Sequence, residues 1–208
     1  MKCLFKKLFT LEGNIGAGKT TLLQLLERNI PNCLILSEPV GEWKAVGGEN
    51  LLNCFYTDPK RWCFTFEVFS MISKLKALKE ALKSDAEIII MERSLYSDKS
   101  FHNLSYFLEK LDLKEMKILQ DLYNNFIKEY PGFNGVIYLN TDLKTCMERI
   151  KKRGRKEETA ITEDYLKKLA DQLQTIEFRC PKLEVDGKYD IKKPQMMLQL
   201  IKEFIKNN

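Results

Sequence analysis

The sequence contains a single histidine, His102, and its six cysteines are scattered, with no two of them in a C-x-x-C pair. A structural zinc site needs clustered cysteine and histidine ligands, so the sequence predicts none. No apolar run approaches the roughly 20 residues needed to span a bilayer, and there is no internal repeat or low-complexity linker. A chain of 208 residues is long enough for one well-buried domain and short for two, so we expect a single domain over residues 1–208.

The composition is that of a folded, soluble protein, with 44% apolar and 30% charged residues. The first seven residues run straight into an apolar segment, which leaves no room for a leader peptide and favours a cytoplasmic location. The scattered cysteines fit that location, because they read as reduced, packed thiols. The formal net charge of +5 is modest. A nucleic-acid binder and a phosphate-handling enzyme would both show such an excess.

A glycine-rich segment at residues 13–20 matches the phosphate-binding pattern G-x-x-x-x-G-K-[ST]. An apolar, β-prone run at 8–11 precedes it and a helix-forming segment at 21–28 follows it, which is the context that this motif requires. The glycines allow consecutive backbone N–H groups to surround phosphate oxygens at a helix N-terminus. Lys19 is expected to reach the terminal phosphates, and the Thr20 hydroxyl to bind magnesium. The residues predicted to hold a nucleoside triphosphate here are Gly13, Asn14, Ile15, Gly16, Ala17, Gly18, Lys19, Thr20 and Thr21.

Short apolar runs alternate with longer helical patterns along the chain. Such alternation predicts an α/β fold with a parallel sheet covered by helices. Strands are predicted at 8–11, 33–36, 88–91, 136–139 and 183–185, and helices at 59–84, from 112 or 113 to 130, from 142 through 149, from 162 to about 179, and from 194 to the C-terminus.

Charged side chains directly follow the second and third predicted strands. Glu38 comes after the second, and Glu92 and Arg93 close the third. In open parallel sheets, ligands bind beyond the carboxyl ends of the strands, so these groups are expected near the phosphates. A carboxylate there can hold magnesium or its water, and the arginine can orient a nucleophile or neutralise phosphate charge.

Basic residues gather after the fourth predicted strand, from Arg149 to Lys156. The segment has three interpretations: a solvated helix end favoured by the helix dipole, a nucleic-acid patch, or a mobile lid whose arginines close on a transferring phosphoryl group. Gly154 between two arginines suits a hinge, and Glu157 and Glu158 would weaken binding to a polyanion. We therefore favour the lid over nucleic-acid binding.

Five blocks of the chain resemble the deoxyribonucleoside kinase family, nearer its deoxycytidine/deoxyguanosine kinase branch than the thymidine-accepting one. They read EGNIGAGKTT at 12–21, EPVGEW at 38–43, YTDPKRWCFTF at 56–66, ERSLYSD at 92–98 and RGRKEE at 153–158. The likeness extends from about Phe9 to Tyr165. It implies a P-loop NTPase-like fold with a five-stranded parallel sheet flanked by helices and an arginine-rich lid. It also implies a homodimer formed through packed helices, acting in nucleotide salvage without a nucleic-acid or membrane partner.

The resemblance implies ATP-dependent, magnesium-assisted transfer of a phosphoryl group to the 5′-hydroxyl of a deoxyribonucleoside. Glu38 corresponds to the general base, and Arg93 to the arginine that holds this carboxylate and the hydroxyl together. Glu92 corresponds to the carboxylate that positions magnesium beside Thr20. Phosphate contacts are implied for Lys19, Arg149, Arg153 and Arg155, and a contact to the adenine of the donor for the loop at 185–190, which includes Asp190.

The sugar and base contacts are implied in the same way. Tyr56 and Glu158 correspond to the pair that binds the 3′-hydroxyl, and Tyr56 also crowds the 2′ position, which implies a preference for deoxyribose. The residues that correspond to the walls of the base slot are Val40, Trp43, Leu52, Phe55 and Phe66.

Three positions depart from the family pattern. Glu67 stands where a glutamine usually reads the base edge, Lys74 replaces an arginine opposite Asp98, and His102 stands where a phenylalanine usually stacks, with Phe101 one place earlier. The Lys74 and Asp98 charges argue against thymidine, because members that accept it are uncharged there. Either His102 or Phe101 forms a wall of the base pocket.

An ionised Glu67 can only accept hydrogen bonds. It would repel thymine O4 and cytosine N3 but match the N1–H and N2–H₂ donors of guanine. Keeping Glu67 protonated at neutral pH, so that it imitates glutamine, would cost about 4 kcal/mol. The sequence therefore favours deoxyguanosine, with deoxycytidine as the next candidate.

Two other classes of enzyme or switch share the phosphate loop. A nucleoside monophosphate kinase such as thymidylate kinase also has a lid, but the blocks at 38–43 and 92–98 speak against it. A GTP-dependent switch protein would carry Asn-Lys-x-Asp and Asp-x-x-Gly, and neither occurs. A regulatory subunit with degraded chemistry is a weak alternative, because every implied catalytic group is present.

Overall fold

The structure is a computed structural model that describes residues 6–190 and 193–208. Its centre is a five-stranded sheet, in which the strands lie in the order β2, β3, β1, β4, β5 and every neighbouring pair is parallel. The strands are β1 (Lys7–Glu12), β2 (Cys33–Leu36), β3 (Ile88–Glu92), β4 (Gly135–Asn140) and β5 (Lys182–Asp186). This confirms the predicted fold class and the position of each predicted strand to within a residue or two.

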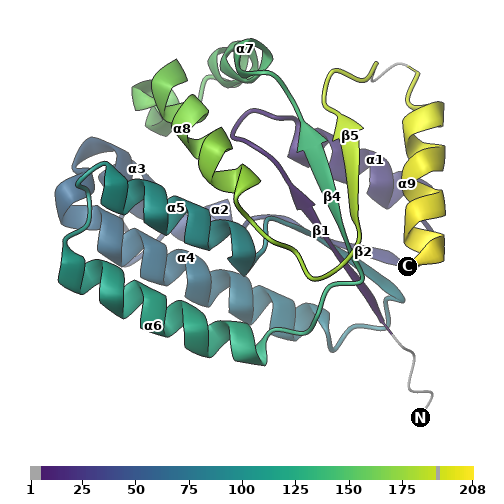
Figure 1. Ribbon diagram of the computed structural model, residues 1–208, viewed down its shortest axis with the longest axis horizontal. Helices are drawn as coiled ribbons and strands as arrows, with labels where there is room; N and C mark the ends of the chain where they lie inside the picture. The colour runs from purple at the N-terminus through teal and green to yellow at the C-terminus, as the bar shows by residue number, and fades with distance from the viewer. Residues whose placement is uncertain (1–5, 191–192) are drawn as a thin grey trace.

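Helices cover both faces of the sheet (Figure 1). On one side lie α4, α5 and α6, side by side, and on the other lie α1 and α9. The helices are α1 (Lys19–Asn29), α2 (Val40–Trp43), α3 (Leu51–Thr57), α4 (Pro59–Ala81), α5 (Leu95–Phe107), α6 (Leu113–Glu129), α7 (Leu143–Arg153), α8 (Glu163–Gln174) and α9 (Gln195–Asn207), with a 3₁₀ turn at Lys156–Ala160.

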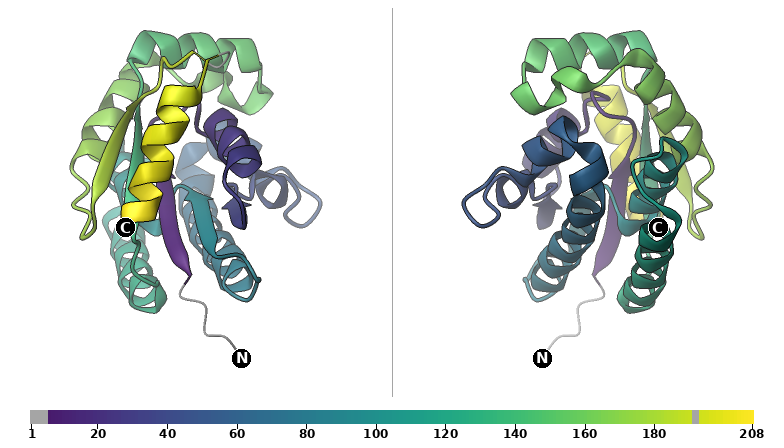
Figure 2. Two further views of the ribbon diagram at one scale, coloured as in Figure 1. Left: turned by 90° about the vertical axis from the view of Figure 1, so that its right-hand side faces the viewer. Right: turned by 90° about the vertical axis from the view of Figure 1, so that its left-hand side faces the viewer.

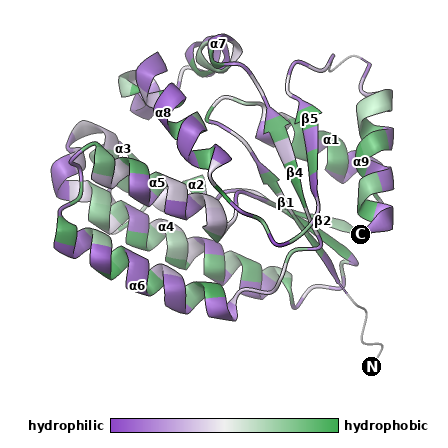
Figure 3. Cartoon of the chain, viewed as in Figure 1, coloured by the Kyte–Doolittle hydropathy of each residue, from purple (hydrophilic) through white to green (hydrophobic). Residues whose placement is uncertain are grey.

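The central strands are apolar on both sides, as buried parallel strands should be. Along β1, Leu8 packs into the core under α4 and α6, whereas Phe9 and Leu11 pack into the core under α1, α8 and α9. Ile89 and Ile90 of β3 alternate in the same way. Figure 3 shows helices whose colours alternate along their length, as expected for helices with one buried face.

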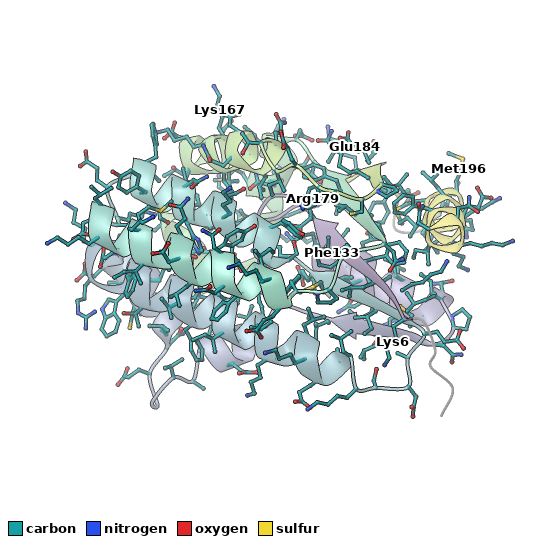
Figure 4. The ribbon with its side chains drawn as sticks, turned by 60° about the horizontal axis from the view of Figure 1, so that its bottom comes forward. Lys6, Phe133, Lys167, Arg179, Glu184 and Met196 are labelled. Atoms are coloured by element: carbon teal, nitrogen blue, oxygen red, sulfur yellow. The ribbon has the colours of Figure 1, made fainter. Side chains whose placement is uncertain are left out.

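Polar and charged side chains cover the outside of this core. Figure 4 shows Lys167 of α8 and Met196 of α9 pointing away from the protein, whereas Phe133 lies in the interior beside the sheet. Phe133 packs against Tyr130 and Tyr96, with ring centroids 5.6 Å and 6.0 Å away. Within the described part of the chain, no helix has both the length and the apolar content needed to cross a membrane.

Two predicted helices end earlier than the sequence indicated. The one predicted at 59–84 ends at Ala81, because the chain tightens there: the backbone N–H groups of Lys83 and Ser84 donate to carbonyls three residues back. The one predicted to reach about 179 ends at Gln174, where the Thr175 hydroxyl and N–H both donate to the Gln172 carbonyl. Side-chain hydroxyls that bond to local backbone in this way compete with helix continuation.

The helix predicted from 142 through 149 is longer than expected. Asp142 caps its start by accepting from the Thr145 N–H, as predicted, but α7 continues to Arg153. It ends at Gly154, whose φ of 64° lies in the left-handed region that favours glycine. Arg149 therefore lies within the helix and Arg153 at its last turn.

The carboxyl ends of the strands meet at one end of the sheet, where α7 and α8 lie. Figures 1 and 2 show these two helices at the end of the sheet toward which the strand arrows point. The glycine-rich loop after β1, the segment after β2 and the turn after β3 all reach the same end. The fold therefore gathers the charged blocks of the sequence into one region.

Candidate active site

The glycine-rich loop is held tightly between β1, β4 and α7. Gly13 has a φ of 142° and Gly16 a φ of 77°. A Cβ on Gly13 would lie 2.7 Å from the Leu139 carbonyl oxygen, and one on Gly16 would lie 2.5 Å from that of Cys146. These glycines are required both by backbone conformation and by the close approach of neighbouring backbone.

Lys19 folds back over this loop. Its Nζ donates to the carbonyl oxygens of Asn14, at 2.8 Å, and Gly13, at 3.2 Å. Burial, with the positive charge of Arg93 nearby, lowers the pKa of Lys19 to about 8. The amine thus rests on weak neutral acceptors in an electropositive, desolvated site, and an anion in the loop would be a stronger partner.

Thr20 and Glu92 bring two kinds of oxygen together at the end of β3. The Thr20 hydroxyl donates to Glu92 Oε1 at 3.1 Å and lies 3.3 Å from Oε2. Hydroxyl and carboxylate oxygens suit magnesium, which usually completes its shell with water and phosphate. The described residues contain no cluster of three or more carboxylate, histidine or cysteine ligands. The chemistry of this pair fits a metal held jointly by protein and phosphate.

Arg93 and Glu38 form a buried ion pair between the ends of β2 and β3. Arg93 Nη1 donates to Glu38 Oε2 at 2.8 Å, and the guanidinium lies 5.3 Å from the centre of the Phe101 ring. Arg93 has a φ of 55°, in the left-handed region. A conformation of this kind costs about 1–3 kcal/mol in a non-glycine residue and is concentrated at functional sites.

Glu38 is kept ionised by the cations around it. Burial alone would raise its pKa, but the charges of Arg93, Lys74 and Lys19 together outweigh that effect and lower the pKa below its usual value. Lys74 Nζ lies 3.9 Å from Glu38 Oε1. The result is a carboxylate ready to accept a proton or a hydrogen bond at neutral pH.

A cavity of about 600 Å³ contains these groups. One part is lined by the phosphate loop and by cationic side chains of α7 and the turn after it, including Arg149, Arg153 and Arg155. The other part is aromatic: the Phe55 and Phe66 rings are stacked with centroids 4.7 Å apart, and Trp43 packs edge-on to Phe66. A cationic region beside a flat aromatic slot is suited to a phosphate and a planar ring.

Most predicted site residues do line this cavity. They are Ile15, Gly16, Gly18, Lys19, Thr20, Thr21, Glu38, Val40, Trp43, Leu52, Phe55, Tyr56, Phe66, Glu67, Lys74, Glu92, Arg93, Asp98, Arg149, Arg153, Arg155 and Glu158. Gly13, Asn14 and Ala17 lie in the loop itself, where the Ala17 carbonyl accepts from Arg149 and the Asn14 amide donates to Leu166.

Two predicted site residues lie elsewhere. Of the two rings that the sequence left open, Phe101 lines the cavity, and His102 is buried beside Glu67 instead. The reason is helical geometry, because adjacent residues on α5 point in directions about 100° apart. Asp190 is exposed, and its neighbour Tyr189 lines the cavity instead.

The sequence analysis missed several lining residues. Ser70 could have been found, because it lies one turn after Glu67 and Phe66 on α4. Tyr165 carries no comparable signal, because it comes from α8. Tyr189 lies in the loop at 185–190, which was named as a whole. The residues not named individually are Ser37, Ser70, Lys152, Tyr165 and Tyr189.

Ion pairs between its own residues hold the segment after α7. Arg153 and Arg155 both donate to the Glu158 carboxylate. Burial, together with the negative charge of Glu158, raises the pKa of Tyr56, so its hydroxyl stays protonated. Two arginines, a carboxylate and a phenol thus meet at the boundary between the cationic and aromatic parts of the cavity.

Comparison with known proteins agrees with this geometry. The sequence pattern of the deoxynucleoside kinase family matches residues 9–206. The chain is 35% identical to the mitochondrial deoxyguanosine kinase of Xenopus laevis, over 80% of this chain and 71% of that protein. It is 34% identical to a probable deoxycytidine kinase of fowlpox virus, over 88% and 80%, and 32% identical to human deoxycytidine kinase, over 96% and 91%. With a family match over almost its whole length, the chain belongs to the deoxynucleoside kinase family.

Proposed function

We propose that this deoxynucleoside kinase uses Glu38 as the general base that accepts the proton of the nucleoside 5′-hydroxyl. The observation that carries the proposal is the buried ion pair of Glu38 Oε2 with Arg93 Nη1, at 2.8 Å, beside the phosphate loop. Arg93 holds the carboxylate in place and leaves Oε1 of Glu38 for the hydroxyl. The attacking oxygen then lies between this base and the γ-phosphoryl group held in the loop. Phosphoryl transfer depends mainly on such positioning and on charge neutralisation.

ATP is the proposed phosphoryl donor, with its phosphates in the loop at 13–20. Phosphate would replace the contacts that now occupy the cationic groups. Among the described residues, Lys19 donates to backbone carbonyls alone, and Arg149 donates to those of Ala17 and Gly187. Arg153 and Arg155 supply further positive charge from the end of α7 and the turn that follows. An arginine acting on the transferred group can be worth about 10³–10⁵ in rate in nucleotide enzymes.

The sugar is proposed to bind between Tyr56 and Glu158, and the base between the rings of Phe66, Phe55 and Trp43. The Tyr56 hydroxyl is a donor and Glu158 an acceptor, which together match a 3′-hydroxyl. Glu67, Lys74 and Asp98 lie in the wall of the same slot. An ionised Glu67 matches the N1–H and N2–H₂ donors of guanine and repels cytosine N3 and thymine O4, so it favours guanine.

The first prediction concerns Glu38 as the general base. Glu38→Gln keeps the size of the side chain but removes its ability to take a proton, so kcat should fall by about 10²–10⁴, as is typical for a positioned base. Glu42→Gln is the matched control, because Glu42 is on the same segment with 47% of its side chain exposed and pairs with the exposed Lys76. A coupled assay of nucleoside phosphorylation measures both. Full activity in Glu38→Gln would disprove the assigned role.

The second prediction concerns magnesium, which we propose to be held by Thr20, Glu92 and the donor phosphates. Glu92→Gln removes the charge that favours the metal, so half-maximal activity should require about ten-fold or more magnesium, in line with losses of about 10–100-fold at metal sites. Glu87→Gln, at an exposed position just before β3, is the control. An unchanged magnesium titration in Glu92→Gln would place the metal elsewhere.

The third prediction concerns the base preference. At pH 7.5, the wild-type kinase should have a higher kcat/KM for deoxyguanosine than for deoxycytidine or thymidine, and Glu67→Gln should shift the preference toward deoxycytidine. Deoxyinosine, which keeps N1–H but lacks the 2-amino group, should fall between the first two. Rates measured for the four deoxynucleosides, deoxyinosine and guanosine test this. A wild-type preference for thymidine or deoxycytidine would contradict it.

The fourth prediction concerns assembly, and we propose a homodimer formed through α4 and α6. These helices pack against each other and carry the exposed side chains Ile72, Leu113 and Ile118, at 46%, 70% and 50%. Such apolar side chains on adjacent helices suit a helix-to-helix interface. Sedimentation equilibrium should find twice the 24.4 kDa chain mass, and Ile118→Lys should shift the protein toward monomer. A monomeric wild type would contradict the proposal.

The proposed location is the cytoplasm. The cysteines in the described part of the chain, Cys33, Cys54, Cys63, Cys146 and Cys180, are free thiols, which supports a reducing compartment. The proposed role there is salvage of deoxynucleosides for DNA precursors.

A further inference from the structure

The contact between α4 and α5 is built from polar side chains, although it is buried. On α4, Glu67 and Lys74 are two turns apart and share a face, and on α5, Asp98, His102 and Ser105 share the facing side. None of these five residues is more than 3% exposed. Buried polar groups need hydrogen-bond or ion-pair partners. The partner of each of these five side chains therefore shows how its buried charge or polar group is satisfied.

These groups are arranged as successive acid–base pairs. Near the catalytic end, Lys74 forms an ion pair with Asp98 and lies 3.9 Å from Glu38. One turn further from Asp98 along α5, His102 Nε2 lies 3.4 Å from Glu67 Oε2. That nitrogen is fully buried, and no hydrogen-bond partner for it is found among the described residues. The Ser105 hydroxyl lies 3.5 Å from the other oxygen of Glu67, Oε1.

The remaining charged neighbours do not neutralise Glu67. Lys74 is already shared between Asp98 and Glu38, which lie closer to the phosphate loop. Lys110 lies over the rings of Phe55 and Tyr165, at 5.4 Å and 4.8 Å from their centres. Its charge attracts Glu67 only at longer range, because Lys110 forms no ion pair within the part of the chain that the structure describes.

The other titratable groups near the pair are acidic or neutral: Asp98, the Cys63 thiol and the Tyr165 phenol. A buried carboxylate with no counter-charge is strongly unfavourable. Among the described residues, His102 is the side chain within ion-pair distance of Glu67 that can supply a positive charge.

We propose that His102 is a positioning residue for base recognition: its protonated imidazole pairs with Glu67 Oε2, keeps the carboxylate ionised, and turns Oε1 toward the bound base. The proposal rests on the proposed nucleoside kinase function and adds the element that selects the base. His102 lies outside the cavity, so it acts only through Glu67. Oε1 can then only accept, and its two lone pairs match the adjacent N1–H and N2–H₂ donors that guanine presents and the other DNA bases do not.

A double-mutant cycle tests the proposal with His102→Phe, Glu67→Gln and the combined variant. The measured quantity is the ratio of kcat/KM for deoxyguanosine to that for deoxycytidine. Each single variant should lower this ratio by about ten-fold or more. This is the loss of discrimination expected when a buried hydrogen-bonding group no longer matches the donors of guanine. The double variant should lower it no further than Glu67→Gln, because His102 acts through Glu67. In His102→Phe the change should appear as a raised KM for deoxyguanosine, with kcat for deoxycytidine little altered.

Thermal unfolding without ligand gives an independent readout of the same pair. His102→Phe leaves a buried charge unpaired, so its Tm should fall by about 6 °C or more, and adding Glu67→Gln should recover part of the loss. Ser100→Ala is the control, because Ser100 is also buried on α5 and its hydroxyl donates to the Gln172 carbonyl, away from Glu67. It should lower Tm modestly and leave the base ratio unchanged.

The proposal is overturned if His102→Phe keeps the wild-type ratio, or if the two substitutions change the ratio by independent factors. Failure of the proposed function has a different signature, namely a wild type that phosphorylates none of the deoxynucleosides. In that case, calorimetry measures the Kd values of deoxyguanosine and deoxycytidine, and the ratio of the two replaces the kinetic ratio. An equal Kd ratio in wild type and His102→Phe, or binding of neither nucleoside, would also reject the role of His102.

Discussion

The guanidinium of Arg93 joins three parts of the chain that are far apart in sequence. It pairs with Glu38 after β2, lies 3.4 Å from the Gly13 carbonyl in the phosphate loop, and covers the Phe101 ring on α5. To do so it adopts a left-handed backbone conformation at the end of β3. The next residue, Ser94, is held by Glu12, whose Oε1 accepts from both its N–H and its hydroxyl. The end of β1 thus fixes the turn that orients Arg93. This places the aromatic part of the cavity next to its cationic part.

The electrostatics of the site follow from this arrangement. Cations and carboxylates alternate from the loop toward the base slot, so most buried charges have an opposite neighbour. The alternation resolves the conflict at Glu38 between burial, which opposes ionisation, and the three cations, which favour it. A network of this kind is sensitive to the removal of any single member, because the partner is left buried and unpaired. It also links Glu67 on α4 and His102 on α5, the proposed base-recognition pair, to Glu38, the proposed general base, through Lys74 and Asp98.

Sequence reasoning predicted the strands and the phosphate loop well because each rests on local chemistry. Apolar runs such as 88–91 have to be buried on both faces, and the spacing of glycines around Lys19 has few other structural uses. Helix ends were predicted less well, since they depend on single hydrogen bonds such as those of Thr175 and on the conformation of Gly154. Asp142, whose capping role is local, was assigned correctly.

The sequence by itself determined the α/β layout, the anion-binding loop and the position of Glu38, Glu92 and Arg93 at strand ends, because periodicity, glycine spacing and strand direction are properties of neighbouring residues. Only the tertiary structure decided that Phe101 faces the cavity, that Tyr165 and Tyr189 complete its wall, and that His102 lies against Glu67. Those relations depend on the rotation of α5 about its axis and on how α4, α5 and α8 pack. Packing of this kind is fixed by the whole core and leaves no mark in any one segment.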